Sequence, residues 1–122
     1  MTTAVRSAMS TRVLGVDPRT SVQVALAVMA RSGVRHLPVI DHGRCLGIVS
    51  EAAALWHAWA GHGDDRIGAC MRAPASQVDQ DASLEAAAKA IATSGVDAVV
   101  VTADGALVGI LTSTDIVRAL AG

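Results

Sequence analysis

A hydroxyl and a carboxylate lie three residues apart where an apolar run gives way to polar residues. Thr112 and Asp115 follow Gly109-Ile110-Leu111. The spacing Thr-x-x-Asp at the start of a predicted helix resembles a capping box, with Asp in the usual place of Glu or Gln. The same groups are also suited to a ligand, because a carboxylate accepts several hydrogen bonds and helix N-terminal amides favour an anion. Both interpretations, capping and ligand binding, stay open at this point.

The other residues capable of chemistry form no recognisable constellation. Cys45 and Cys70 are far apart and lack an obvious base beside them, so we expect two reduced, partly buried thiols. No Gly-x-Gly-x-x-Gly or P-loop pattern occurs. The histidines lack the spacing of a zinc site; they are His36, His42, His57 and His62. We therefore expect no catalytic residues, no metal site and no enzyme activity.

Composition narrows the class of protein. The chain has 122 residues, a one-domain length, and 52% of them are hydrophobic. No apolar run approaches the roughly 18 residues that span a bilayer, and the N-terminal stretch lacks a signal-peptide core. The net charge of −1 supplies no basic excess for nucleic acid. We expect a cytoplasmic protein that has neither a nucleic-acid partner nor a membrane partner.

The sequence contains an internal repeat. An offset of 62 positions aligns the chain with itself from Val5 to the C-terminus without a gap. Residues that match at this offset include Met9 and Met71, Ser21 and Ser83, Gly33 and Gly95, and Gly47 and Gly109. We interpret residues 5–60 and 67–122 as two copies, joined by a polar stretch at 61–65, within a single module spanning residues 1–122.

Each copy has the same predicted order of elements. An extended segment precedes a helix with a serine N-cap and a C-terminal glycine, and two strands joined by a turn precede a closing helix. In the first copy the extended segment is 13–16, the two strands are 34–40 and 46–49 with the turn at 41–43 between them, and the closing helix is 51–59. In the second copy the extended segment is 76–78, the two strands are 96–102 and 108–111 with the turn at 103–105 between them, and the closing helix is 113–120. The predicted apolar helix stripes are Val22, Leu26 and Met29, and Leu84, Ala88 and Ile91.

This order predicts an α/β (α+β) fold of tandem β-α-β-β-α motifs. One copy alone covers too little of its sheet, whereas two copies packed with pseudo-twofold symmetry bury both sheets.

The repeated pattern resembles the CBS motif. The resemblance rests on Leu37-Pro38-Val39-Ile40 followed by Gly47-Ile48-Val49-Ser50, and on Val99-Val100-Val101 followed by the stretch from Gly109 to Asp115. It covers nearly the whole chain. It implies a CBS pair, or Bateman module, of the kind that commonly forms a homodimer. It also implies an adenosine-containing ligand, such as AMP, ADP, ATP or S-adenosylmethionine, in a cleft between motifs.

The resemblance also implies roles for particular residues. Asp115 would accept hydrogen bonds from both ribose hydroxyls, and Thr112 would meet a phosphate. Val13 and Ile110 would cover the faces of the adenine, and backbone groups would read its edge. The remaining candidates for contact with the ligand are Arg12, Arg35, His36, Leu37 and Pro38. For Arg35 a solvated strand edge, and for His36 a hydrogen-bonded strand histidine, are the alternatives.

The first copy departs from the pattern, because Ala53 stands where Asp115 stands in the second copy. An alanine cannot accept a hydrogen bond from ribose, so we expect one ligand site per chain. Asp97 and Ala98, which match Arg35 and His36, offer no positive charge to a phosphate.

Trp56 and Trp59 share one face of a predicted helix. They either cover the core near the linker or form a dimer contact, since aromatic residues are enriched at interfaces. Two functions fit the whole sequence. One is a ligand-sensing regulatory module that acts through an unidentified effector protein. The other is a structural homodimer or interaction module without a nucleotide ligand.

Overall fold

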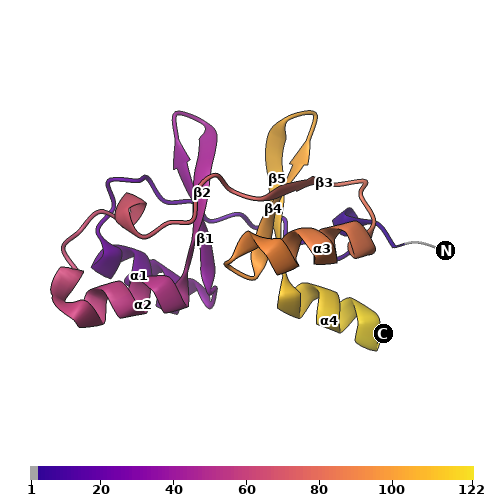
Figure 1. The fold of residues 1–122 in the computed structure, drawn as a ribbon. Helices are drawn as coiled ribbons and strands as arrows, with labels where there is room; N and C mark the ends of the chain where they lie inside the picture. Colours follow the sequence, from indigo (N-terminus) through magenta and orange to yellow (C-terminus); the bar gives the residue numbers. More distant parts are fainter. Residues whose placement is uncertain (1–2) are drawn as a thin grey trace. The chain divides into compact units, whose positions relative to one another are not determined.

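The computed structural model describes residues 3–122. The chain divides into two compact units, each containing helices and a small sheet (Figure 1). We call Leu14–Pro74 the first-copy unit. The second-copy unit combines the N-terminal stretch through Val13 with Ala75–Gly122. The predicted mixture of helices and strands in two repeated motifs is confirmed.

The first-copy unit is built around an antiparallel hairpin. Its strands are β1 (His36–Asp41) and β2 (Arg44–Ser50). Helices α1 (Val22–Ser32) and α2 (Glu51–His57) lie together beside this hairpin (Figure 1). A π-helical turn, η2 (Ala58–His62), continues α2, and a short 3-10 helix, η3 (Ile67–Ala69), follows it.

The second-copy unit has a 3-10 helix, two α-helices and a hairpin like the first-copy unit, together with one more strand. A 3-10 helix, η1 (Val5–Ser7), lies in its N-terminal stretch. Strand β3 (Gln77–Asp79) pairs parallel with β4 (Ala98–Ala103), which pairs antiparallel with β5 (Ala106–Thr112). The helices are α3 (Leu84–Ser94) and α4 (Ser113–Ala121).

The extra strand has a local cause. In the second copy the Gln80 amide donates to the Thr102 carbonyl at 2.8 Å, which extends the ladder of β3. The position 62 residues earlier is Pro18, which has no amide hydrogen to donate. The predicted extended segment 13–16 therefore makes only a single parallel bridge, from Val16 to Val39.

The opening segment of each copy pairs with the last strand of the other copy. Ser10 and Ile110 exchange two backbone hydrogen bonds of 2.9 and 3.0 Å, and Arg72 and Ile48 exchange two of 2.7 and 3.0 Å. A glycine permits each approach. A Cβ at Gly47, for example, would lie 2.5 Å from the Arg72 carbonyl oxygen. This exchange explains why each compact unit contains residues from both sequence copies.

Caps and turns form where the sequence predicts them. The Ser21 hydroxyl accepts from the Val24 amide and the Ser83 hydroxyl from the Ala86 amide, both at 3.1 Å. Gly33 ends α1 with φ of 69°. Its neighbour Val34 donates to the Met29 carbonyl, so the strand predicted over 34–40 begins only at His36. Both hairpins turn through two residues with positive φ; these are His42 and Gly43, and Asp104 and Gly105.

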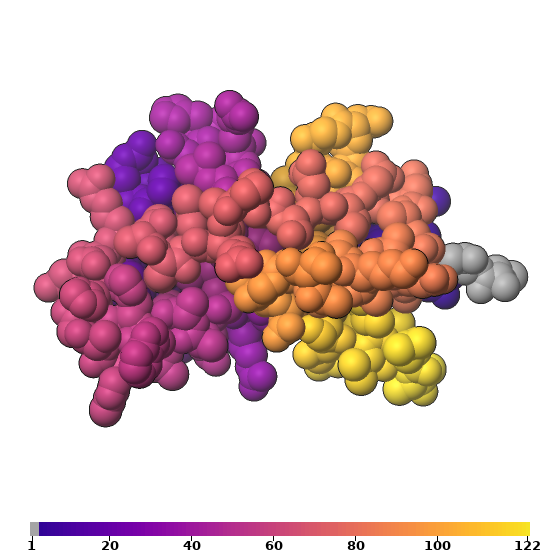
Figure 2. Space-filling view, viewed as in Figure 1, coloured from indigo at the N-terminus to yellow at the C-terminus, as the bar shows by residue number. Residues whose placement is uncertain are grey.

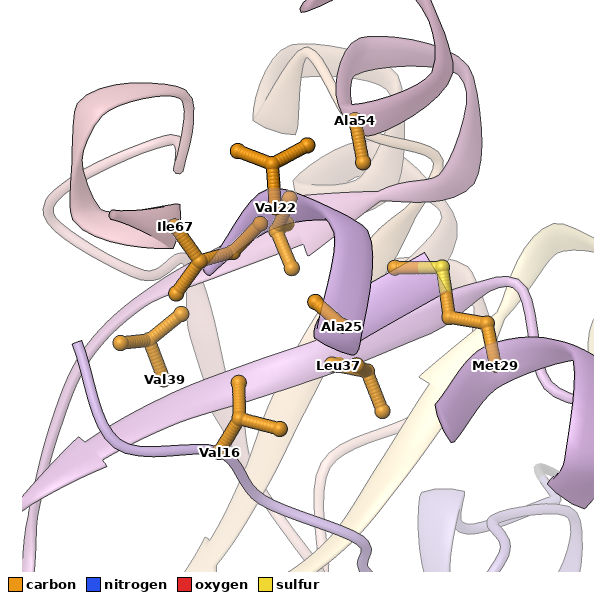
Figure 3. Packing of buried hydrophobic residues seen from close by; sticks show 9 residues of the cluster. Val16, Val22, Ala25, Met29, Leu37, Val39, Ala54 and Ile67 are labelled. Carbon is orange, nitrogen blue, oxygen red and sulfur yellow. The ribbon is translucent and has the colours of Figure 1, made fainter. Parts of the chain in front are cut away.

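Each unit has its own core. Figure 3 shows that of the first-copy unit, in which Val22, Ala25 and Met29 of α1 pack with Leu37 and Val39 of β1. The second core contains Val5, Ala87, Ile91, Val99, Val101, Leu111 and Ile116. One predicted core position is wrong, because Ala88 is exposed and Ala87 is buried in its place. The run of alanines in α3 gives no size contrast from which to choose the buried face.

Candidate ligand site at the start of α4

Thr112 and Asp115 form a reciprocal capping box at the start of α4. The Asp115 amide donates to the Thr112 hydroxyl oxygen at 3.3 Å. The Thr112 amide donates to Oδ2 of Asp115 at 2.9 Å, and the Thr112 hydroxyl donates to the same oxygen at 3.1 Å. The capping interpretation is therefore confirmed, and it is compatible with a ligand, because it occupies one carboxylate oxygen.

The second carboxylate oxygen of Asp115 has no hydrogen-bond partner among residues 3–122. The Asp115 side chain is half-buried, so this oxygen is held in a fixed position at the helix start. An ionised carboxylate oxygen in such a position is a strong acceptor for hydroxyl donors.

Asp97, just before β4, is held against the same helix start. Its carbonyl oxygen accepts from the Ser113 amide at 3.1 Å and from the Ser113 hydroxyl at 3.2 Å. Asp97 has φ of 59°, which is uncommon outside glycine, and the residue is exposed. No local sequence pattern indicates this contact, because Asp97 and Ser113 are 16 positions apart.

Three further candidates lie in the same unit as Thr112 and Asp115. Ile110, on β5, is half-buried and bonded to Ser10 through both backbone groups. Arg12 and Val13 follow Ser10 closely in the chain; Arg12 is exposed and Val13 is half-buried. The bond between Ser10 and Ile110 therefore anchors the segment that carries Arg12 and Val13.

The remaining candidates lie in the first-copy unit. Arg35 is exposed, and its carbonyl oxygen accepts from the Glu51 amide at 2.8 Å. His36 is half-buried at the start of β1. Leu37 belongs to the hydrophobic core and Pro38 is buried, so only their backbone groups are suited to contact a ligand. The Pro38 carbonyl already accepts from Val16.

The start of α2 lacks the carboxylate. The Ser50 hydroxyl accepts from the Ala53 amide at 3.1 Å, which matches half of the Thr112 capping box. Ala53 has no side-chain acceptor to complete it. The two copies thus share a helix start but differ in the group that would bind a diol.

Elsewhere in the first-copy unit, His57 and His62 both approach Asp65, at 3.1 and 3.7 Å. No group of three or more potential ligands in the described part of the chain is suited to a metal ion. Burial raises the pKa of both the Cys45 and the Cys70 thiol. The ordinary thiol pKa is already about 8.5, so both cysteines are neutral at pH 7.

The tryptophans do not cover the core. Trp56 is 71% exposed and Trp59 is 84% exposed, so that interpretation was wrong. The closing helix of the second-copy unit also exposes apolar side chains, Val117 at 63% and Leu120 at 81%. Both closing helices reach the surface of their units (Figure 2). None of the helices in residues 3–122 is long and apolar enough to span a membrane.

Comparison with known proteins identifies the family. The CBS domain model matches residues 5–57 and 67–122. CBSX2 in complex with AMP is 30% identical, with a TM-score of 0.77, over 97% of this chain and 96% of that one. CBSX2 from Arabidopsis thaliana is 29% identical, with a TM-score of 0.82, over 99% of this chain and 96% of that one.

A third structure shares the fold at lower identity. The CBS domain pair of protein MJ0100, in complex with 5′-methylthioadenosine and S-adenosyl-L-methionine, is 23% identical with a TM-score of 0.90. The alignment covers 100% of this chain and 98% of that one. No match is found among curated proteins. The family model matches two successive segments that together cover most of the chain. The chain therefore belongs to the CBS domain family and contains a tandem CBS pair.

Proposed function

We propose that the chain is a regulatory module that binds an adenosine-containing ligand and passes the signal to a partner protein. The candidate ligands are AMP, ADP, ATP and S-adenosylmethionine. CBS domain pairs are typically regulatory rather than catalytic, and the relative CBSX2 has been crystallised with AMP. The effector would be a separate protein in the cytoplasm.

One observation carries the proposal: the half-buried Asp115 carboxylate keeps one oxygen without a partner among residues 3–122. A ribose offers two neighbouring hydroxyl donors. Oδ2 already accepts two hydrogen bonds from Thr112, so Oδ1 would accept from both ribose hydroxyls. Buried donors left unpaired cost about 1–3 kcal/mol, so a site without this carboxylate would bind a ribose roughly 5- to 150-fold more weakly.

The same reasoning limits the number of sites. Ala53 replaces the carboxylate in the first copy, so we expect one ligand per chain. Ile110, Val13 and Arg12 belong to the unit of Asp115 and are our candidates for contact with the base. Residues 35–38 of the first copy are further candidates, and the variant Arg35→Ala tests the most exposed of them.

A thermal-shift series tests the proposal. A ligand present at 100 times its Kd adds about 2.7 kcal/mol to the free energy of unfolding, which raises the Tm by several degrees. We expect at least one adenosine compound to raise the Tm of the wild-type protein and to raise that of Asp115→Asn by clearly less. Guanosine and cytidine compounds are the matched controls. Equal shifts in the wild type and in Asp115→Asn would contradict the proposed site.

A second function, a homodimeric interaction module, is favoured by the exposed apolar side chains. Leu55, Trp56 and Trp59 form what we call the tryptophan face of α2 and η2. We propose that a second copy of this chain covers it. A twofold dimer needs a patch that can meet itself, and this face contains no charged side chain that would repel its copy. Dimerisation is compatible with ligand binding.

A further inference from the structure

We propose that the site at α4 selects adenosine compounds by their 5′ substituent, with Asp97 as the specificity-determining residue. Neutral substituents such as a thioether, and positively charged ones such as a sulfonium, bind more tightly than phosphates. This inference rests on the proposed function and narrows its ligand class.

The first observation is that the donors of the helix start are already occupied. The Ser113 amide donates to the Asp97 carbonyl and the Asp115 amide to the Thr112 hydroxyl. The Thr112 hydroxyl hydrogen is directed to Asp115. Of the amides of residues 113–115, only that of Thr114 has no partner in the described chain. A phosphate arriving here would find one amide without a partner and would have to displace existing hydrogen bonds to reach the others, unlike at an open helix N-terminus.

The second observation is that the acidic residues at the start of α4 give it a negative charge. Two aspartates, Asp97 and Asp115, belong to this helix start, where two hydrogen bonds from Ser113 hold the Asp97 carbonyl and the Asp97 side chain is exposed. The equivalent position in the first copy is Arg35, whose carbonyl accepts from Glu51 in the same way. The two helix starts therefore have the same backbone arrangement and opposite charge at this position.

The expected size of the effect follows from Coulomb's law. At low ionic strength and the dielectric constant of water, a phosphate dianion about 8 Å from one carboxylate binds roughly 5-fold more weakly, and a sulfonium is attracted instead. The basic residues of this unit, Arg6, Arg12, Lys89 and Arg118, are exposed, and Arg6 and Lys89 are paired with Asp81 and Glu85. Asp97 is exposed as well, so salt screens all of these charges and the comparison is made at low ionic strength.

The test compares ligands that share adenosine and differ at the 5′ position. Calorimetry would measure the Kd of 5′-methylthioadenosine, S-adenosylmethionine and AMP with the wild type and Asp97→Asn. Asparagine tolerates positive φ. Asp97→Gly, which has no backbone strain at this φ, is a second variant if Asp97→Asn folds poorly. Asp104→Asn is the matched control, because Asp104 is also an exposed aspartate with positive φ in the same unit.

At low ionic strength we expect AMP to bind the wild type about 5-fold more weakly than 5′-methylthioadenosine. The ratio should fall toward one in Asp97→Asn and stay unchanged in Asp104→Asn. Equal affinities in the wild type, or a ratio that Asp97→Asn and Asp97→Gly leave unchanged, would overturn the selectivity and leave the adenosine site standing. Failure of all three compounds to bind would overturn both proposals.

Discussion

The Asp115 carboxylate accepts two hydrogen bonds from Thr112, one from its backbone amide at 2.9 Å and one from its hydroxyl at 3.1 Å. Both end on Oδ2, so the residue caps α4 with one oxygen and leaves the other without a hydrogen-bond partner among residues 3–122. A capping group and a binding group are commonly alternative explanations of one residue. Here capping uses one oxygen, and the binding that we propose would use the other.

Capping can be separated from binding by stability measurements. Asp115→Ala removes half of the capping box and should lower the free energy of unfolding by about 1 kcal/mol. The reciprocal change, Ala53→Asp, supplies the missing acceptor beside Ser50 and should raise it by up to about 1 kcal/mol. Chemical denaturation of both variants checks the pair. A loss of more than about 3 kcal/mol in Asp115→Ala would show that the side chain supports the core as well.

The exchange of opening segments predicts a strict requirement for glycine. A Cβ at Gly47 would lie 2.5 Å from the Arg72 carbonyl oxygen, so Gly47→Ala must push the two backbones apart. We expect a loss of about 1–3 kcal/mol. Gly68→Ala in the same unit is the control, because its nearest neighbour would be 3.5 Å away. Similar denaturation midpoints for the two variants would count against the close approach at Gly47.

Much of the fold follows from local signals. Ser21, Ser83, Gly33 and the two hairpin turns are confirmed where the sequence predicts them. Each depends on a conformational preference of one or two residues, and such preferences are visible in sequence.

Long-range pairing is not visible in the same way. Nothing in the residues around Ser10 indicates that its partner is Ile110, 100 positions later in the chain. The contact between Asp97 and Ser113 cannot be predicted from the sequence for the same reason, because the two residues are 16 positions apart. The exposure of Trp56 and Trp59 could not be predicted either, since an aromatic pair on one helix face suits a core and an interface equally well.

The cysteines predict a dependence of stability on alkaline pH. Burial raises the pKa of the Cys45 and Cys70 thiols, so the folded protein favours their neutral forms. A thiol pKa that is higher in the folded protein than in the unfolded chain stabilises the fold at pH values below the unfolded-chain pKa, about 8.5. This stabilisation is lost as the pH rises through the thiol pKa of the folded protein. The free energy of unfolding should therefore decline above about pH 8.5. Cys45→Ala combined with Cys70→Ala should remove this part of the decline. An identical pH profile in the double variant would contradict the assignment.

The tryptophan face predicts self-association. Replacing Trp56 and Trp59 with serine should weaken a dimer by at least about 2 kcal/mol, since buried tryptophans are frequent hot spots. Sedimentation velocity across a concentration series would measure the change. Val24→Ser, at another exposed apolar position in the same unit, is the control for general loss of apolar surface. A wild-type protein that stays monomeric at tens of micromolar would rule out the second copy as the partner.

The central claim is that Asp115 holds an adenosine-containing ligand at one site per chain. Isothermal titration calorimetry with 5′-methylthioadenosine, S-adenosylmethionine and AMP measures both stoichiometry and affinity. We predict one ligand per chain in the wild type, and an affinity at least about 5-fold lower in Asp115→Asn, which keeps a capping side chain but loses the charge. Two equal sites per chain, or full affinity in Asp115→Asn, would contradict the account.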